Sequence, residues 1–466
     1  MRHATPKRRH PLISPKPVAR RAIVVGAGIG GLAAAGALAD WFEHVIVLDR
    51  DILPDEPMPR SGTPQARHSH GLLLGGLLAL EELFPDIQGD LVRAGAVQVR
   101  INRDMREEWP EREPMPQRDF GWVSYTMSRA LIESTLRRCL SERANVTCRP
   151  NTRALALLAD SQGRRVVGLR CEPAGGGVGE TLLADLVVDA SGRGQLTKAL
   201  LQSIGRPLPS ETAIGIDLGY TTASLDIPDG APSDWKVLLT HSQPPCSSRL
   251  AVMLQIEGDR WMMTAAGRGD DRPPGEWTAL LDYLRHLPTP TLYNAVRHAR
   301  PIGELARFGQ PESVWRHFEQ LKAFPDGLLP IGDAICRFNP IYGQGMTVVA
   351  KEASLLHRLL GTWATQRDPL AGLGQLFLGE AKSLIETPWM MAAIPDFAFP
   401  GTRGDRPADL DYSLRFAGAL SRIAARDAAV QRLMIEVRHM LKPRTVYEEP
   451  ALRQRVEAEM TEMAAS

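Results

Sequence analysis

The chain has 466 residues, of which 44% are hydrophobic and 23% charged, and its formal net charge is +1. This is the balance of a globular protein that can bury one or two cores. The near-zero charge excludes strong electrostatic attraction to nucleic acid or to an anionic membrane. The five cysteines have no paired or CxxC spacing. This argues against a disulfide framework and a metal site, and it favours a reducing, cytoplasmic location.

Residues 1–20 are basic and proline-rich, which predicts a disordered leader. The uncharged run Ala22–Ala39 follows Arg20 and Arg21 and has the length of a membrane span. Glycines interrupt that run at the spacing of a dinucleotide-binding turn. We therefore expect neither an export signal nor a transmembrane segment.

A strand, a glycine turn, a helix and a second strand follow the leader. The strands are predicted at Ile23–Val25 and Val45–Leu48, and the helix at Leu32–Trp41. Such a βαβ unit of about 30 residues binds one end of a dinucleotide.

The turn of this unit has the sequence Gly26-x-Gly28-x-x-Gly31. The first glycine permits the tight turn, the second lets the backbone approach a pyrophosphate, and the third lets helix and strand pack closely. The N–H groups at the helix N-terminus favour the same anion. Asp49 lies 18 residues after Gly31, where it can accept a hydrogen bond from a ribose hydroxyl.

A second glycine block lies far downstream, at Leu329–Met346. It predicts a buried strand, the pair Gly332-Asp333, a glycine loop and a helix that begins near Gly345. The carboxylate of Asp333 could bind flavin hydroxyls, and the helix N-terminus favours negative charge on a flavin ring. We expect Gly345 to need glycine both for space and for its backbone angle. Together, the two blocks predict one non-covalent FAD held by both parts of the chain.

Between and after these blocks the pattern changes several times. Residues 51–70 predict a loop, and residues 102–119 have no clear period. The other predicted elements are helices at 72–84 and 128–141 and strands at 166–169 and 182–188. In residues 210–270, segments of alternating hydrophobic and polar residues are separated by glycine and proline turns. This pattern predicts an inserted antiparallel sheet. From about residue 370 the chain has helical spacing, and the stripe from Leu410 to Ile423 is interpreted as core packing.

Several aromatic and methionine side chains fall in the predicted sheet. They are Tyr220, Trp235, Met253, Met262 and Met263. Such side chains form cores, and they also line apolar substrate pockets, so both interpretations stay open.

Five motifs occur in one order along the chain: the glycine turn, the Arg-rich loop Arg60–His70, Ser128-Arg129, the Asp-Ala-Ser-Gly segment at Asp189, and the downstream glycine block. This order resembles the single-component FAD-dependent monooxygenases with the para-hydroxybenzoate hydroxylase fold. The resemblance covers about residues 20–360. The Arg60–His70 and Phe338–Gly345 segments are similar to a bacterial branch that includes polyether-type polyene epoxidases. The chain departs from the pattern of this family at two places. Asp49 stands where the family usually has Glu, and Ser191–Arg193 stand where it usually has an Asp-Gly motif.

The resemblance implies a role for each matching residue. Arg60 would lie near the FAD pyrophosphate, Arg129 would contact the cofactor from its helix, and Asp189 would lie near FAD and a visiting nicotinamide. Asp333 would bind the ribityl chain, and the loop from Pro340 would line the ring. The expected cofactor-binding residues are Gly26, Gly28, Gly30, Gly31, Asp49, Arg50, Arg60, Arg129, Asp189, Gly332, Asp333, Pro340, Gly343, Gln344, Gly345 and Met346.

The candidate catalytic residues are His68, His70 and Tyr220. The two histidines alternate along an extended loop, so we expect only one of them to face the cavity. A structural role is the simpler interpretation for each histidine.

The predicted function is FAD-dependent monooxygenation with NADPH or NADH and molecular oxygen. The resemblance implies that a flavin C4a-hydroperoxide transfers one oxygen to an apolar or aromatic small molecule, by hydroxylation or epoxidation, in secondary metabolism. One alternative is a flavin-dependent reductase or dehydrogenase of an isoprenoid-like substrate. A less favoured alternative is a halogenase, because Trp389–Pro395 only partly matches the halogenase Trp-x-Trp-x-Ile-Pro wording.

The predicted fold class is α/β (α+β overall), with four parts. They are the leader at 1–20, a discontinuous Rossmann-like FAD-binding domain at 21–100, 125–209 and 321–365, an antiparallel-sheet substrate domain at 101–124 and 210–320, and a C-terminal helical region at 366–466.

Overall fold

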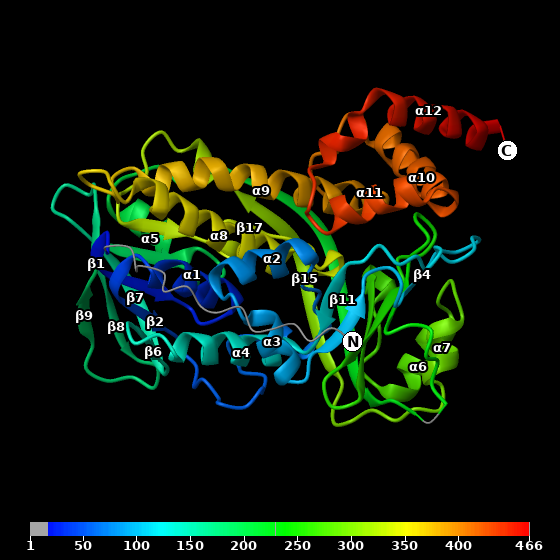
Figure 1. Cartoon of the computed structure of the whole chain (residues 1–466), viewed down its shortest axis with the longest axis horizontal. Coiled ribbons are helices and arrows are strands. Elements are labelled where there is room, and N and C mark those ends of the chain that lie inside the picture. The colour runs from blue at the N-terminus through cyan, green and yellow to red at the C-terminus, as the bar shows by residue number, and fades with distance from the viewer. Residues whose placement is uncertain (1–16, 229, 466) are drawn as a thin grey trace, which may run out of the picture.

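The computed structural model describes residues 17–228 and 230–465. Most of the predicted leader lies outside these residues, and strand β1 already begins at Ala19. Figure 1 shows one half with a parallel sheet beneath helices, a second half with a large twisted sheet, and C-terminal helices above the second half. The predicted fold class, an α/β domain with an inserted antiparallel sheet and a C-terminal helical region, is confirmed.

The first half is built on a five-stranded parallel sheet. Its strands, in spatial order, are β16 (Leu328–Pro330), β10 (Leu186–Asp189), β1 (Ala19–Val25), β2 (Phe42–Leu48) and β6 (Val146–Arg149). A smaller antiparallel sheet, β7 (Thr152–Ala159), β8 (Val166–Pro173) and β9 (Glu180–Leu183), packs against it. Because β1 is central and buried, the glycine turn that follows it opens at the carboxyl edge of the sheet, where ligands bind in such folds.

Helices cover the parallel sheet. They are α1 (Ile29–Ala39), α2 (Leu74–Leu83), α3 (Ile87–Arg93), α4 (Arg129–Ser141), α5 (Gln195–Ser203) and α8 (Gly345–Trp363). Ser128 caps α4, since its hydroxyl accepts a hydrogen bond from the N–H of Leu131. Helix α1 packs closely on α8 because glycine faces Val349: a Cβ on Gly30 would lie 2.8 Å from the Val349 side chain.

The second half contains a seven-stranded sheet. Its strands, in spatial order, are β17 (Cys336–Arg337), β15 (Ala306–Arg316), β11 (Glu211–Asp226), β14 (Arg260–Arg268), β13 (Leu250–Ile256), β12 (Val237–Thr240) and β4 (Met105–Glu108). All neighbours are antiparallel except β12 and β4. Helices α6 (Trp277–Arg285) and α7 (Thr291–Val296) cover one face of this sheet. The hairpin-like pair β3 (Val97–Arg100) and β5 (Val123–Thr126) lies beside it.

The C-terminal region is helical. It consists of α9 (Leu373–Asp396), α10 (Leu410–Arg426), α11 (Ala428–Arg438) and α12 (Pro450–Ala465). In Figure 1, α9 runs beside α8, and α10–α12 (orange to red) lie over the end of the large sheet. Leu420 and Ile423 of the predicted stripe pack against α12 in a core of their own, so the interpretation as core packing is confirmed for them, whereas Ala417 of the same stripe is exposed.

One local prediction is wrong. Residues 182–188 were expected to form one strand, but they divide into β9 and β10 in different sheets. Asp185 lies between the two strands, and its carboxylate accepts hydrogen bonds from the N–H groups of Arg20 and Arg21 at 3.0 and 2.8 Å. Residues 102–119 include the edge strand β4, whose four residues are too few to show a period.

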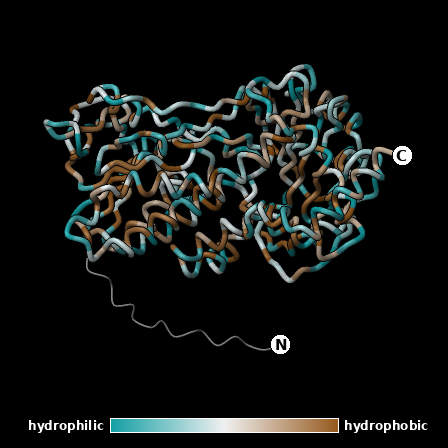
Figure 2. The backbone as a smooth tube through the Cα atoms, turned by 90° about the horizontal axis from the view of Figure 1, so that it is seen from above, coloured by the Kyte–Doolittle hydropathy of each residue, from teal (hydrophilic) through white to brown (hydrophobic). Residues whose placement is uncertain are grey.

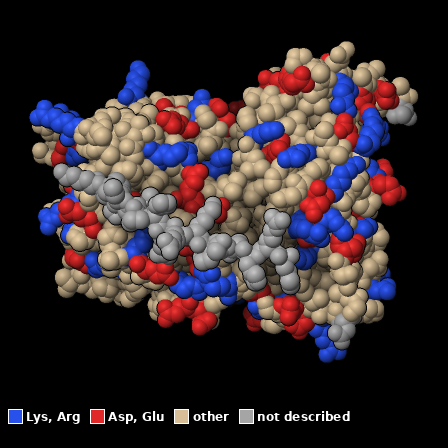
Figure 3. Space-filling model, in the orientation of Figure 1, with Lys and Arg blue, Asp and Glu red and all other residues tan. Residues whose placement is uncertain are grey.

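Figure 2 shows hydrophobic segments in the interior of both halves. Figure 3 shows basic and acidic side chains interspersed over the visible face, as expected for a chain of near-zero net charge. No helix of the described residues has both the length and the apolar character needed to cross a membrane.

Candidate active site

The glycine turn between β1 and α1 brings backbone groups very close together. Gly26 has φ +105°, and a Cβ there would lie 2.6 Å from the carbonyl oxygen of Ala190. A Cβ on Gly31 would lie 1.7 Å from the carbonyl oxygen of Gly26. Gly28 immediately precedes α1 and lines a large cavity. A ligand in that cavity can therefore reach the free N–H groups at the helix N-terminus.

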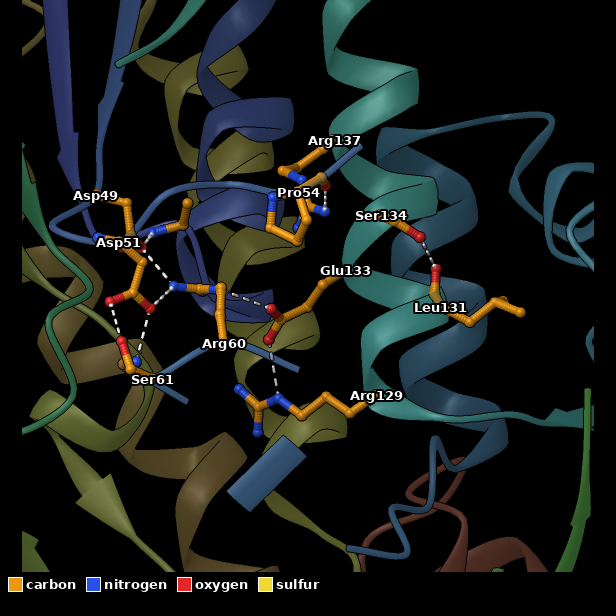
Figure 4. Close-up of polar contacts among 12 residues, drawn as sticks. Asp49, Asp51, Pro54, Arg60, Ser61, Arg129, Leu131, Glu133, Ser134 and Arg137 are labelled. Atoms are coloured by element: carbon orange, nitrogen blue, oxygen red, sulfur yellow. Dashed lines mark hydrogen bonds and ion pairs between the residues drawn. The ribbon is translucent and has the colours of Figure 1, made fainter. Parts of the chain in front are cut away.

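Arg60 lies in a buried cluster beside this turn (Figure 4). Its Nη1 donates to Asp49 and Asp51 at 3.0 Å each, and its Nε donates to Glu133 at 3.3 Å. Glu133 also accepts a hydrogen bond from Arg129 at 2.9 Å. Burial alone would lower the pKa of Arg60, but Glu133 and the two aspartates raise it. Arg60 is thus a fixed positive charge in a fixed position.

The second terminal nitrogen of Arg60, Nη2, is buried and has no hydrogen-bond partner among the described residues. A Cβ on Gly28 would lie 4.0 Å from this nitrogen and 3.7 Å from Nη2 of Arg129. Both guanidinium groups therefore face the open part of the glycine turn. Because an unpaired buried donor costs about 1–3 kcal/mol, an anion here would satisfy Arg60 and the helix N-terminus together. The site fits the pyrophosphate of FAD.

The carboxylate of Asp49 is largely occupied by the protein. It accepts hydrogen bonds from the N–H of Ala27 at 2.7 Å, from the N–H of Asp51 at 2.8 Å and from Arg60. A carboxylate has about four acceptor positions, so one is left for the predicted ribose hydroxyl. Arg50 is exposed and also lines the cavity.

Asp189 is fully buried and is not among the residues that line the cavity. Its carboxylate accepts hydrogen bonds from the backbone and hydroxyl of Ser191 and from those of Thr197, at 2.5–3.1 Å. Asp189 therefore fixes the turn before α5. The cavity is lined instead by the neighbours Ser191, Gly192 and Arg193.

The Gly332-Asp333 pair lies at the same edge of the parallel sheet. Gly332 has φ +65°, and its N–H donates to Glu352 of α8 at 2.7 Å. Burial, with a smaller contribution from Asp333, raises the pKa of Glu352 to about 8 against the opposing effect of this hydrogen bond. Asp333 itself is exposed to the cavity, and its carboxylate makes no hydrogen bond to another described residue. It is free to accept from a ligand hydroxyl.

The loop Pro340–Met346 lines the cavity and leads into α8. Gly343 has φ +66°, so it is the position that favours glycine. The expectation for Gly345 is wrong in one respect: this residue is the first of α8, its φ is not positive, and no atom lies within 4 Å of an added Cβ. Any need for glycine at position 345 must come from a ligand in the cavity.

The buried carboxylate of Asp396 fixes this loop by hydrogen bonds from the side opposite the cavity. One oxygen of Asp396, at the end of α9, accepts hydrogen bonds from Asn339 at 2.9 Å, from the Tyr342 hydroxyl at 2.8 Å and from Arg268. Nearby, Trp389 packs on Trp315 and Phe338. The segment Trp389–Pro395, which partly matches the halogenase motif, thus contributes to the core beneath the loop.

His68 and His70 both line the cavity, although only one was expected to do so. His70 Nδ1 lies 2.8 Å from the carbonyl oxygen of His68, and its Nε2 lies 3.4 Å from Nη1 of Arg129. His68 packs edge-on against Tyr220, and its Nδ1 lies 2.7 Å from the Thr222 hydroxyl. Burial lowers the pKa of His68 to about 4 and that of His70 to about 3, with nearby arginines adding to the effect. Both imidazoles are therefore neutral at pH 7.

The glycine turn, the two guanidinium groups, Asp333, the Pro340–Met346 loop and the two histidines line one cavity of about 1570 Å³. Typical single-ligand pockets measure roughly 300–1,000 Å³, so there is room for a second molecule beside a dinucleotide. The second wall is one face of the seven-stranded sheet, where Leu250, Val252 and Leu254 of β13 line the cavity.

The three methionines of the predicted sheet, Met253, Met262 and Met263, are not among the residues that form this wall. Met253 is fully buried and packs with Met263 and Trp235 in the core beneath α6 and α7. Of the two interpretations left open for Met253, core packing is the correct one, because its neighbours Val252 and Leu254 in the strand face the cavity and Met253 faces the other side of the sheet. Tyr220 does line the cavity.

Several residues of the site were not predicted. Glu133 follows Arg129 at i+4, a spacing that could have indicated the pair. Asp396 and the cavity-lining Arg438 and His439 come from the C-terminal helices, and no local motif marks them.

The chain resembles one curated protein across most of its length. It is 34% identical over 419 residues to Protein Rv3254 of Mycobacterium tuberculosis, and the match covers 85% of each chain. No protein-family model matches the chain.

Solved structures of flavoenzymes share its fold. A flavoprotein/dehydrogenase from Cytophaga hutchinsonii has a TM-score of 0.67 at 13% identity, covering 96% of this chain and 100% of that one. The myxobacterial chondrochloren halogenase CndH has a TM-score of 0.63 at 17% identity, with coverage of 91% and 97%. PqsL of Pseudomonas aeruginosa, described as a probable FAD-dependent monooxygenase, has a TM-score of 0.59 at 16% identity, with coverage of 82% and 97%.

Proposed function

The chain belongs to the same family as Protein Rv3254, and we propose that it is an FAD-dependent monooxygenase. In this proposal NADPH or NADH supplies two electrons, and dioxygen supplies one oxygen atom to an apolar or aromatic molecule and the other to water. The product is hydroxylated or epoxidised. The similarity of Arg60–His70 to the polyene epoxidase branch is consistent with the epoxidation arm of this proposal.

The observation that supports FAD binding in this proposal is the unpartnered Nη2 of Arg60. Together with Arg129 it faces the N-terminus of α1, and it lies in the same cavity as the exposed carboxylate of Asp333. A dinucleotide needs an anion site and a hydroxyl acceptor in one cavity, and these three side chains provide them.

Bound FAD would supply the activation of dioxygen. The chain's own residues would do the rest: Arg60 and Arg129 hold the pyrophosphate, Asp333 orients the ribityl hydroxyls, and the Pro340–Gly345 loop seats the ring. The sheet face would place the substrate and exclude water. Neutral His68 lines the cavity, and with Nδ1 engaged by Thr222 it could accept or donate a proton at Nε2.

The test measures oxygen and NAD(P)H consumption by the purified yellow protein, with and without a panel of apolar and aromatic compounds. We expect the correct compound to accelerate both, and ¹⁸O₂ to label the product. A product formed without oxygen uptake would identify a reductase or dehydrogenase. A product whose mass depends on added bromide or chloride would identify a halogenase, and protein that neither contains nor binds FAD would refute the proposal.

A further inference from the structure

One row of side chains crosses the seven-stranded sheet on its cavity face. Strand register aligns, from the edge inward, Glu107 (β4), Leu239 (β12), Val252 (β13), Thr264 (β14) and Thr222 (β11). Directly paired residues point to the same face of a sheet. The inner end of this row is the Thr222 hydroxyl, which lies 2.7 Å from Nδ1 of His68.

The two ends of the row are far apart. Neighbouring strands are ~4.8 Å apart, and four such intervals give about 19 Å between Glu107 and Thr222. Between them, Leu239 and Val252 line the cavity and offer no hydrogen-bonding side chain. The loop Pro340–Met346, which we call the flavin loop, lies near the inner end, because a Cβ on Gly71, three residues after His68, would lie 3.9 Å from the carbonyl oxygen of Gly343. A molecule along this row would therefore reach well away from the ring.

The outer end of the row is polar. Nη1 of Arg438, from α11, donates to both oxygens of Glu107 at 2.7 and 2.8 Å. His241 Nε2 lies 2.9 Å from one of those oxygens, and the Trp109 ring stacks on His241 at 4.3 Å. We call these four side chains the Arg438 cluster. Burial alone would raise the pKa of Glu107, but Arg438 and His241 hold it well below its usual range.

Arg438 still has donors to offer. Its Nε and Nη2 make no hydrogen bond to a described residue, its side chain is 35% exposed, and it lines the cavity. The Nε–Nη2 edge of a guanidinium matches the two oxygens of a carboxylate. An amine would find a weaker partner, because Glu107 is already engaged by Arg438 and His241 and the charge of Arg438 repels a second cation.

We propose that the substrate is an elongated, mainly apolar molecule that ends in a carboxylate, and that Arg438 binds this carboxylate at the outer edge of the sheet. The reacting carbon then lies about 15–20 Å away, three to four strand intervals inward, beside the flavin loop. The inference rests on the proposed function, since it names the substrate class of that same cavity.

The test compares dodecanoate, dodecanol and dodecylamine as probes of the purified, FAD-supplemented protein by titration calorimetry. We expect dodecanoate to bind about 10- to 100-fold more tightly than dodecanol, the range of a charge-assisted hydrogen bond. Dodecylamine should bind most weakly. Equal affinity for dodecanoate and dodecanol, or no binding of dodecanoate, would overturn the inference without any variant.

A double variant, Glu107→Gln with Arg438→Gln, removes both charges so that neither is left buried alone. It should lose the preference for dodecanoate while dodecanol affinity changes less than about threefold. Arg432→Gln is the matched control, because Arg432 lies on the same helix and is paired with Glu436 outside the cavity. An unchanged preference in the double variant would overturn the inference. Flavin content of the same samples reports separately on the proposed function.

Discussion

The two ends of the cavity are built differently. At the proposed cofactor end, Arg60, Arg129 and their carboxylate partners, all within residues 49–133, are fixed by hydrogen bonds of 2.9–3.3 Å. At the substrate end, the wall is a row of single residues from five strands. A cofactor that many enzymes share can be bound by polar groups that are already held in position. A particular substrate depends on which side chains the sheet register brings to one face.

The strongest test of the cofactor end is Arg60→Gln. It leaves three carboxylates without their shared partner, which for a buried ion pair costs about 3–5 kcal/mol of unfolding free energy. FAD should also be lost on dialysis. Urea unfolding and flavin absorbance measure the two effects.

The matched control is Arg149→Gln, which breaks an ion pair with Glu180 at the surface. It should cost under about 1 kcal/mol and leave FAD bound. If Arg60→Gln behaved like this control, Arg60 would not organise the cofactor end.

Asp333→Asn separates binding from folding at the same end. Because the Asp333 carboxylate makes no bond within the described chain, the stability of the apo-protein should not change. FAD affinity should fall about 10- to 100-fold, as expected for a lost charge-assisted hydrogen bond. FAD titration of apo-protein gives the dissociation constant.

Asp49→Asn provides the contrast. Asp49 holds Ala27 and Arg60, so this variant should lose folding stability as well as FAD affinity. Equal loss of stability in the two variants would show that Asp333 is structural.

Adjacent tryptophan substitutions test the substrate wall. Val252→Trp points into the cavity and should raise KM, or change the product, while the protein keeps its FAD. Met253→Trp points into the α6–α7 core, where overpacking typically costs about 1–3 kcal/mol. Thermal unfolding and steady-state kinetics of both variants decide the matter, and the reverse pattern would mean that the sheet face is misassigned.

Glycine substitutions in the flavin loop give the smallest effects on stability. Gly343→Ala should destabilise the protein by about 1 kcal/mol, because its φ of +66° disfavours a side chain. Gly345→Ala should be neutral or slightly stabilising in the apo-protein, since it lies in a helix with open space around it.

FAD binding then distinguishes the two positions. Gly345→Ala should weaken FAD binding if the ring lies against this residue, whereas Gly343→Ala should act mainly through folding. Unchanged FAD affinity for Gly345→Ala would place the ring elsewhere in the cavity.

The glycine turn and the Gly332-Asp333 pair could be found in the sequence because each motif consists of a few consecutive residues whose conformation is set locally. The turn of Gly26 and the capped helix after Ser128 depend on neighbours within a few residues. The sequence could not decide between core and pocket for Met253, because the side-chain period of a strand is two and a shift of one residue exchanges the faces.

The C-terminal contributions are a different case. Asp396 and Arg438 reach the cavity only through tertiary packing of α9 and α11, which no spacing in their own segments encodes. The domain boundaries stay predictions for the same reason: β17 lies in a segment assigned to the FAD-binding domain, yet it pairs with β15 of the large sheet.

The most direct test of the central claim is a crystal structure of the protein with FAD. We expect the pyrophosphate between Arg60, Arg129 and Gly28, a ribityl hydroxyl on Asp333, and the ring beside Pro340–Gly345 with one face toward Val252. FAD bound in another part of the molecule, or a pyrophosphate that leaves Nη2 of Arg60 unpaired, would contradict it.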